Sequence, residues 1–590
     1  MWLINTSTLL LEPFYSDDTP AYAILSHTWE DSEVSFQEFA QASENWNVKI
    51  ASKAGYRKIV ATCQQALKDG YCYAWVDTCC IDKTSSTELT EAINSMFGWY
   101  RRSQICYVYL SDFMLDMGDF SSQQDQFDAH FRRCRWFTRG WCLQELLAPR
   151  HLRFFSQKWL EIGEKSSLSR LISDIAGVPE AVLVMHPKRD IKDFPIAVRI
   201  SWIAKRQTSR TEDMSYSLLG ILDVNMPMLY GEGPKAFIRL QEEIIRKYND
   251  LSIFAWTGDA TGSGFMPILA AKPSSFISDP AAHYGSDSRS RLGSRLSTHF
   301  SLTNQGVFFP NAKLQYQNAV PQYHHHYLLD LNYRFTPFRG RGGSQRYILL
   351  QKIGPGLFIR LHDTAERLRA FQKKPVTTPF YEPVCILHNL SQPLVRQLAL
   401  WERYAVRLRW KGWEKLGRRF WHIRTAQPRA SWDIPANQFL LEIASERYMH
   451  IEFVPGNYET NPDLEYFVLV IQVGDDKKRD PAKVSVQIVS AEIWRLNATT
   501  FGFRGKEALA LEALQSTQSA GDSNRISLVG YDISMSVQLV TEPDEVAYHH
   551  VYLDWEATSS RTDTAEAVSS PSSETCRVET ARSGKLSPKR

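Results

Sequence analysis

Trp136-Phe-Thr-Arg-Gly-Trp-Cys-Leu-Gln-Glu-Leu-Leu-Ala-Pro149 is the stretch around which the rest of the chain is organised. Three of its leucines recur at the spacing of one helix face: Leu143, Leu146 and Leu147. This pattern predicts a short helix that turns one face to a core. It also predicts that the helix ends at the proline, whose ring cannot continue it.

One carboxylate, Glu145, lies on this helix four residues after Trp141, on a face that differs from the leucine face. The pKa of a carboxyl group beside an indole at the margin of a core can be shifted, which makes Glu145 a candidate functional residue. The plain alternative is a surface ion pair with Arg135 or Arg139. The segments around the helix bear on this choice.

The composition is that of an ordinary globular protein, with 43% apolar and 23% charged residues and a formal charge of +3. At 590 residues the chain is too long for one core, and we expect roughly three or four domains. No signal peptide or membrane-spanning apolar run is present, so no membrane partner is expected. Nine cysteines without a paired C-x-x-C framework favour reduced thiols, and the expected location is cytoplasmic.

Four short apolar runs are interpreted as buried strands: residues 21–25, 73–76, 105–110 and 152–155. Helical periodicity separates the first three, over residues 56–67 and 89–100, and Ser85 and Glu88 have capping-box spacing before the second helix. Strands that alternate with helices in this way predict βαβ units. The sequence therefore predicts an α/β domain over residues 1–164, built on a parallel sheet.

Polar residues follow three of these strands directly: Ser26 and His27, Asp77 and Thr78, and Ser111 and Asp112. Ligands bind at the carboxyl ends of the strands in parallel sheets. Helices begin on the same side, so Glu145, within two turns of its helix start, could reach the same crevice. Polar strand ends are also ordinary loops, and that alternative stays open.

Cys79 and Cys80 follow Asp77 closely. No histidine lies near them in the sequence, so buried thiols are favoured over a catalytic cysteine. Asp77 and Asp82 flank the pair. They are interpreted as polar groups at a strand end that either cap the next helix or contact a ligand.

The apolar residues recur at helical spacing over residues 165–260, which predicts a helical region. Beyond residue 290 they alternate with a period of two. The latter predicts a β-rich region over 290–555, with one or two antiparallel sandwich-like units. The tail, residues 557–590, is rich in Ser, Thr and charge and is predicted to be disordered.

Three further segments have a plain structural interpretation. Gly231–Lys235 lacks the spacing of a phosphate-binding loop, and its proline removes a donor, so a structural turn is expected. His324–His326 has no acidic or cysteine partner at ligand spacing, and no metal site is predicted. Basic and aromatic residues alternate over 403–424, where a half-buried strand-turn-strand is favoured over nucleic-acid stacking. Nucleic acid is therefore not an expected partner.

Four segments together resemble the fungal heterokaryon-incompatibility (HET) domain: Ala23–Trp29, Trp75–Lys83 with Glu88–Met96, Cys106–Asp112 and Trp136–Pro149. The resemblance covers residues 20–160. Residues 210–256 resemble the helical extension that often follows such domains. HET domains are regarded as distant relatives of Toll/interleukin-1 receptor (TIR) domains, and Trp141–Leu146 is similar to the W-C-L-x-E-L run of plant TIR domains.

This resemblance implies a TIR- or flavodoxin-like sheet with helices on both faces, and a role in nonself recognition that leads to regulated cell death. In enzymatic TIR domains the glutamate of the W-C-L-x-E-L run is essential for cleaving NAD between nicotinamide and ribose, and here that residue is Glu145. NAD is then the implied substrate, and no other cofactor is expected. The residues implied to bind it are Ser26, His27, Trp29, Asp77, Asp82, Ser111 and Trp141.

A second hypothesis is a non-enzymatic signalling scaffold whose HET domain only self-associates. Under either hypothesis the expected partners are a second copy of the domain and an unknown protein or trigger sensed by the β-rich region. The surroundings of Glu145 discriminate between the hypotheses. An enzyme requires a cleft shared with Ser26 and Asp77, whereas a scaffold is expected to bury Glu145 in a pair with Arg135 or Arg139.

Overall fold

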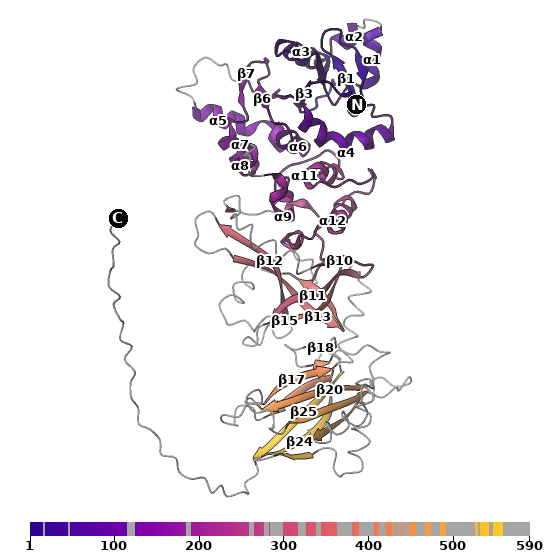
Figure 1. Cartoon of the computed structure of the whole chain (residues 1–590), viewed down its shortest axis with the longest axis vertical. Helices are drawn as coiled ribbons and strands as arrows, with labels where there is room; N and C mark the ends of the chain where they lie inside the picture. The colour runs from indigo at the N-terminus through magenta and orange to yellow at the C-terminus, as the bar shows by residue number, and fades with distance from the viewer. Residues whose placement is uncertain are drawn as a thin grey trace, which may run out of the picture.

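Figure 1 shows a computed structural model of the chain, in which an α/β region, a helical region and a β-rich region follow one another in chain order along the long axis. The structure describes residues 1–15, 18–44, 48–114, 124–184, 190–258, 265–276, 282–283, 299–316, 326–337, 344–362, 380–388, 406–411, 421–427, 431–433, 438–439, 448–455, 466–473, 484–490, 525–528, 531–541 and 547–557. The predicted disordered tail therefore lies outside the described residues, apart from its first position.

The N-terminal region contains a seven-stranded sheet with the order β2-β1-β4-β3-β5-β6-β7. Its strands are β1 Trp2–Asn5, β2 Leu11–Pro13, β3 Tyr22–His27, β4 Tyr73–Trp75, β5 Ile105–Tyr109, β6 Leu152–Phe155 and β7 Glu161–Glu164. The four central strands β4, β3, β5 and β6 are parallel, as predicted, because helical crossovers connect the first three of them. Antiparallel strands flank them on both sides. The sheet is therefore mixed, and only its centre is the predicted parallel sheet.

Seven short or medium helices belong to this described region: α1 Phe36–Glu44, α2 Val48–Ala51, α3 Ala54–Lys68, α4 Ser86–Arg102, α5 Gln124–Arg133, the 3₁₀ helix Arg135–Thr138 and α6 Cys142–Leu147. The start of α4 fulfils half of the predicted capping box, because Ser85 Oγ accepts a hydrogen bond from Glu88 N at 3.3 Å. The Glu88 carboxylate instead accepts from Asp82 N at 3.0 Å. The cap therefore ties α4 to the loop that follows β4.

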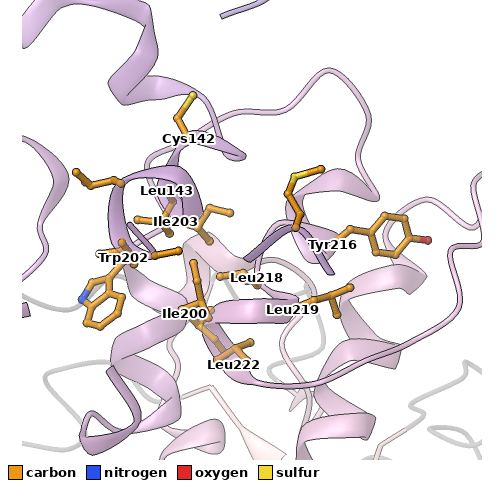
Figure 2. Packing of buried hydrophobic residues seen from close by; sticks show 14 of the residues in the cluster. Cys142, Leu143, Ile200, Trp202, Ile203, Tyr216, Leu218, Leu219 and Leu222 are labelled. Atoms are coloured by element: carbon orange, nitrogen blue, oxygen red, sulfur yellow. The ribbon is translucent and has the colours of Figure 1, made fainter. Parts of the chain in front are cut away.

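The helical region packs directly on α6. Its helices are α7 Ser169–Ala176, α8 Glu180–Leu183, α9 Ile196–Ser201, α10 Asp213–Tyr216, α11 Leu219–Leu222 and α12 Lys235–Lys247. Figure 2 shows Cys142 and Leu143 of α6 in one apolar cluster with Ile200, Ile203 and Leu218. The same continuous cluster extends through the N-terminal sheet and into the first β-sheet beyond the helices. The helical region therefore shares its core with both neighbours.

The first part of the β-rich region closes into a barrel-like sheet. Its strands are β11 Gly306–Tyr316, β12 His326–Pro337, β13 Ser344–Gly354, β14 Leu357–Leu361 and β15 Phe380–Leu387. They pair in the order β11-β15-β14-β13-β12, and β12 pairs back with β11. The short strands β8 Phe265–Met266, β9 Ala282–His283 and β10 Ser301–Leu302 add to this ring. The sandwich expected for this part is not confirmed. The register shifts in β11, β12 and β13 are the bends that let a sheet curl onto itself.

The remaining strands form two further sheets. They are β16 Val406–Lys411, β17 Trp421–Gln427, β18 Trp432–Asp433, β19 Gln438–Phe439, β20 Tyr448–Pro455, β21 Phe467–Val473, β22 Val484–Ser490, β23 Arg525–Leu528, β24 Tyr531–Thr541 and β25 Ala547–Ala557. One sheet has the order β18-β19-β16-β25-β24-β23 and the other β17-β20-β21-β22. Tyr327 Oη donates to Asp433 Oδ1 at 2.8 Å and Lys352 Nζ to the Trp432 carbonyl at 2.9 Å. These bonds attach β18, and thus its sheet, to the barrel.

Two of the segments with a plain structural interpretation fall partly outside the described residues. Of His324–His326 only His326 is described, and of the basic and aromatic segment 403–424 the structure describes β16 and the start of β17. In the described ranges no group of His, Cys, Asp and Glu side chains is arranged to hold a metal ion. The helices in those ranges are also too short or too polar to cross a bilayer.

Candidate functional site

The polar residues at the ends of β3 and β4 come together at the carboxyl edge of the sheet. His27, the last residue of β3, lies 3.0 Å from Asp77 Oδ1 through its Nε2, and Asp77 follows β4. β3 is the first parallel strand, with β4 on one side and β5 on the other. This edge is therefore the topological switch point of the parallel strands, where ligands bind in open α/β sheets.

Glu145 is held by the strand end directly. The Ser26 hydroxyl donates a short hydrogen bond to Glu145 Oε2. Trp136 Nε1 in turn donates to Ser26 Oγ at 2.7 Å. The indole therefore occupies an acceptor position of the hydroxyl and leaves its proton directed at the carboxylate. A strand end, a 3₁₀ helix and α6 meet in this chain of two hydrogen bonds.

The surface ion pair considered for Glu145 is wrong. Glu145 is only 6% exposed, and no basic nitrogen lies within 4.0 Å of it among the described residues. Arg135 is exposed and approaches Glu30 and Asp112 instead, at 3.8 Å each. Burial raises the pKa of Glu145 to about 7, against the lowering influence of the nearby Arg139 charge and the Ser26 hydrogen bond. Glu145 can therefore exchange a proton near neutral pH.

A second network fixes the orientation of His27. Lys58 Nζ lies 3.1 Å from His27 Nδ1, and the Lys58 ammonium also donates to Glu33 Oε1. Because an ammonium group can only donate, Nδ1 acts as the acceptor and Nε2 carries the proton that points to Asp77. Trp29 Nε1 donates to the other Asp77 oxygen at 2.7 Å.

Asp77 is ionised in this network. Burial alone would raise the pKa of Asp77, but the His27 hydrogen bond and the charges of Lys83 and Arg139 outweigh it and hold that pKa well below its usual range. Asp77 and Glu145 therefore have pKa values shifted in opposite directions, an arrangement common where two carboxylates have different tasks.

The other predicted site residues lie in different surroundings. Ser111 Oγ is buried and makes no hydrogen bond among the described residues. Asp82 Oδ1 accepts from Gln37 Nε2 at 2.6 Å and from Thr84 N at 2.9 Å, which orders the loop before α4. The N-cap of that helix is Ser85 and not Asp82. Trp141 is half-buried and hydrogen-bonded to Asp213 of α10. Neither Asp82 nor Trp141 makes a hydrogen bond to Glu145.

Arg206, in the helical region, was not predicted as a site residue. It is buried, and its Nη1 donates to the Arg139 carbonyl at 2.9 Å, whereas Nη2 is buried without a partner among the described residues. Burial lowers the pKa of Arg206 to about 10, against the opposing effect of Cys142 and Glu145, so it stays charged at neutral pH. The region outside the α/β domain thus adds a positive charge beside the Glu145 helix.

A short backbone contact positions Arg206. Gly140 N donates to the Gln207 carbonyl at 2.8 Å, and Gln207 N donates to the Thr138 carbonyl at 2.7 Å. A Cβ atom on Gly140 would lie 2.6 Å from Thr208 Cγ2, so only glycine allows the two segments to approach this closely. The sequence carries no signal for the position of Arg206, because pairing between backbone segments leaves no side-chain pattern.

Lys165 holds the other end of α6. Its buried ammonium donates to the carbonyls of Leu146 and Pro149, at 3.3 and 2.5 Å. Leu146 belongs to the last turn of α6, whose acceptors lack partners within the helix, and Pro149 lies just beyond the helix end. Burial lowers the pKa of Lys165 to about 8, against a smaller opposing effect of Cys106.

We expect Lys165→Met to remove one component of the pH dependence of stability. The folded state binds fewer protons than the unfolded state between pH 8 and 10.5, so Lys165 makes the wild type more stable as the pH rises through this window. The free energy of unfolding of the wild type relative to the variant should rise by on the order of 3 kcal/mol from pH 7.5 to 10.5. Denaturant titrations of both proteins at the two pH values measure this. If the free energies of unfolding of wild type and variant differed by the same amount at both pH values, the lowered pKa of a buried Lys165 ammonium would be contradicted.

The loop Gly231–Lys235 and the pair Cys79 and Cys80, considered for phosphate binding and for catalysis, have structural roles. The Glu212 carboxylate accepts from the amides of Gly231 and Gly233, at 2.9 Å each, so the glycine loop binds an internal carboxylate, as expected of a structural turn. Cys79 and Cys80 are buried, and burial raises the pKa of Cys79 well above its ordinary value. The prediction of buried thiols is confirmed.

Comparisons with known proteins bear on the N-terminal half. The sequence model of the family "Heterokaryon incompatibility protein (HET)" matches residues 22–123, and that of a "Domain of unknown function (DUF8212)" matches residues 235–340, from α12 into the barrel. The chain is 47% identical over 232 residues to "Vegetative incompatibility protein HET-E-1" of Podospora anserina. That alignment covers 39% of this chain and 16% of the relative, so the chain matches only a small part of the relative's length. No solved structure matches the chain. The segments resembling a HET domain, the family match and this relative agree, and the chain contains a heterokaryon-incompatibility (HET) domain in its N-terminal region.

Proposed function

We propose that the N-terminal α/β domain cleaves NAD between nicotinamide and ribose, with Glu145 as the catalytic carboxylate. The observation that carries this proposal is a buried carboxyl group at the switch point of the sheet, oriented by Ser26 and carrying a pKa of about 7. The TIR-like ancestry implied by the Trp141–Leu146 run supports the same residue. Ser26, His27, Asp77 and Ser111 are proposed to line the substrate site.

The chemistry matches what such a carboxylate supplies. Loss of nicotinamide develops positive charge on the ribose, in an oxocarbenium-like transition state. An ionised Glu145 would stabilise that charge or orient the attacking water, and its fixed orientation reduces the reorganisation needed during the reaction. A positively charged nicotinamide ring near the carboxylate would favour the ionised form, because an opposite charge lowers a carboxyl pKa.

We also propose that the protein acts in vegetative incompatibility and regulated cell death. The similarity to a vegetative incompatibility protein of Podospora anserina supports this role, and so does the match of residues 22–123 to the HET family. The β-rich region, or a partner protein bound to it, would sense the trigger, and self-association of the HET domain would switch on the activity. NAD loss would then cause the cell death.

A non-enzymatic scaffold is the second candidate, and one observation favours it. Glu145 is 6% exposed and its carboxylate already accepts a hydrogen bond from Ser26. A substrate can reach it only if side chains at the strand ends move. A domain that merely self-associates would need no such movement.

Nicotinamide release separates the two candidates. We expect the purified full-length chain, concentrated until it self-associates, to convert NAD into nicotinamide and ADP-ribose, measured by chromatography. In cells, expression of the wild type should be toxic and expression of Glu145→Ala should not. Self-associated protein that releases no nicotinamide, together with a Glu145→Ala variant that remains toxic, would establish the scaffold instead.

A further inference from the structure

We propose that Lys83 and Arg139 form a binding site for the diphosphate group of the substrate, an inference that rests on the proposed function. The substrate class would then be dinucleotides with a diphosphate on the reacting ribose, and nucleosides that lack the diphosphate would be poor substrates. Neither residue was predicted from the sequence to touch a ligand.

The first observation is that these two cations lack carboxylate partners at close range. Lys58 pairs with Glu33, and Lys53 with Glu38 at 2.7 Å. Among the described residues, no carboxylate oxygen lies within 4.0 Å of Lys83 or Arg139. Lys83 is exposed and Arg139 is half-buried, so an anionic ligand can reach both.

The second observation is that one aromatic ring brings the two charges together. Lys83 Nζ lies 3.9 Å from the Trp29 ring centroid, and Arg139 Cζ lies 5.3 Å from it, so the two groups are within about 9 Å of each other. Trp29 is 43% exposed, but its Nε1 is fixed by the hydrogen bond to Asp77. The ring is therefore an oriented surface platform with positive charge around it.

The third observation is the position of Arg139 relative to the reacting group. Its Nη1 donates to the carbonyl of His27 at 2.8 Å, one residue after the serine that binds Glu145. In NAD the ribose that loses nicotinamide carries the diphosphate on its C5′ oxygen. A guanidinium anchored beside the catalytic carboxylate is thus placed to bind the diphosphate of the same ribose, with the planar donor geometry that suits phosphate.

A purely structural role for the two cations makes a different prediction. Both charges lower the pKa of Asp77 and could serve only to neutralise that carboxylate. In that case their removal would alter stability without changing affinity for an anion. Affinity for a diphosphate probe is therefore the deciding measurement, and it needs no chemical turnover.

The test is calorimetric titration of the full-length chain with inorganic diphosphate and with ADP. We expect the wild type to bind both, and Lys83→Gln and Arg139→Gln each to weaken binding by about tenfold or more. Lys83→Arg should retain affinity because it keeps the charge. Arg135→Gln is the matched control, since Arg135 is an exposed arginine of the same segment that approaches Glu30 and Asp112, and its loss should leave affinity unchanged.

Two results would overturn the proposal: no binding of either probe by the wild type, or equal affinities for wild type and Lys83→Gln. Lys83 is exposed, so this variant remains informative even if Arg139→Gln fails to fold. Failure of the proposed function is a separate outcome, in which diphosphate binds through Lys83 but no nicotinamide is released from NAD. If NAD is cleaved, nicotinamide riboside should have a kcat/KM at least tenfold lower than NAD. Equal values would also reject the diphosphate site.

Discussion

Glu145→Gln is expected to reduce nicotinamide release by a hundredfold or more while making the protein more stable than the wild type at pH 8. Glutamine has the same shape and still accepts a hydrogen bond from Ser26, but it carries no charge to stabilise an oxocarbenium ion. Loss of activity with a gain in stability identifies a residue kept for function rather than for folding.

The gain in stability follows from the raised pKa of Glu145. The folded state binds more protons than the unfolded state between pH 4.5 and 7, so the Glu145 contribution to stability is fully present below pH 4.5 and is lost as the pH rises to about 7. At pH 8 the buried charge costs on the order of 3 kcal/mol relative to the neutral form. The raised pKa already includes the attraction of Arg139, so that charge does not cancel the effect.

Unfolding midpoints of wild type and Glu145→Gln at pH 5 and pH 8 measure this dependence. The advantage of the variant should be small at pH 5 and should grow at pH 8. Glu91→Gln, the same chemical change at an exposed position of α4, is the matched control and should show no such pH-dependent advantage. A Glu145→Gln variant that is less stable at pH 8 than the wild type would mean that the ionised carboxylate holds the fold together.

The sequence was sufficient for those features that depend on short-range pattern. Alternating apolar strands and helices predict the parallel centre of the sheet, and parallel strands place Ser26 and Asp77 at one edge. The leucines of α6 face the core as their spacing predicts. The sequence also identifies Glu145 as the one carboxylate of its helix, and the structure places it in hydrogen-bond contact with Ser26. Its burial was not predictable, because the covering residues come from elsewhere in the chain.

The features that were missed depend on long-range packing. Arg206 reaches the site through the backbone pairing of Gln207 with residues 138–140, about 70 positions earlier. Asp82 orders the loop before α4, and an aspartate in such a turn and one that binds a ligand have the same local sequence. Strands of barrels and of sandwiches likewise show the same alternation of apolar and polar residues, so the sequence does not distinguish the two folds. Closure of β11 onto β12 depends on bulges that this alternation does not reveal.

Gly220→Ala is expected to give the largest loss of stability among single methyl additions to the helical region. Gly220 lies in α11, where a Cβ atom would be 2.0 Å from Phe97 Cβ and 2.4 Å from its Cγ. Carbon atoms in contact are about 3.5–4.0 Å apart, so α11 and α4 would have to separate by more than an ångström. Overpacking of this kind costs about 3 kcal/mol or more, because Phe97 Cβ can move only with the helix backbone.

Gly98→Ala is the matched control for this substitution, since Gly98 follows Phe97 directly in α4. There a Cβ atom meets only the flexible end of Arg102, at 3.2 Å, and alanine should stabilise the helix by about 0.5–1 kcal/mol. Denaturant midpoints of the two variants should therefore move in opposite directions. Two midpoints that both rise would show that α11 does not dock on α4 as closely as the glycine allows.

The damage from Gly220→Ala should also reach the candidate site. α4 contributes Tyr100, whose hydroxyl donates to the Leu25 carbonyl at 2.9 Å, and Met96, whose sulfur accepts from Gln144 Nε2 at 3.1 Å. Leu25 precedes Ser26 and Gln144 precedes Glu145, so a displaced α4 shifts both partners of the Ser26–Glu145 hydrogen bond. Nicotinamide release should therefore fall in Gly220→Ala even at temperatures where the variant stays folded, and should be unchanged in Gly98→Ala. The helical region, although outside the span that matches the HET family, would then be required for the geometry of the carboxylate.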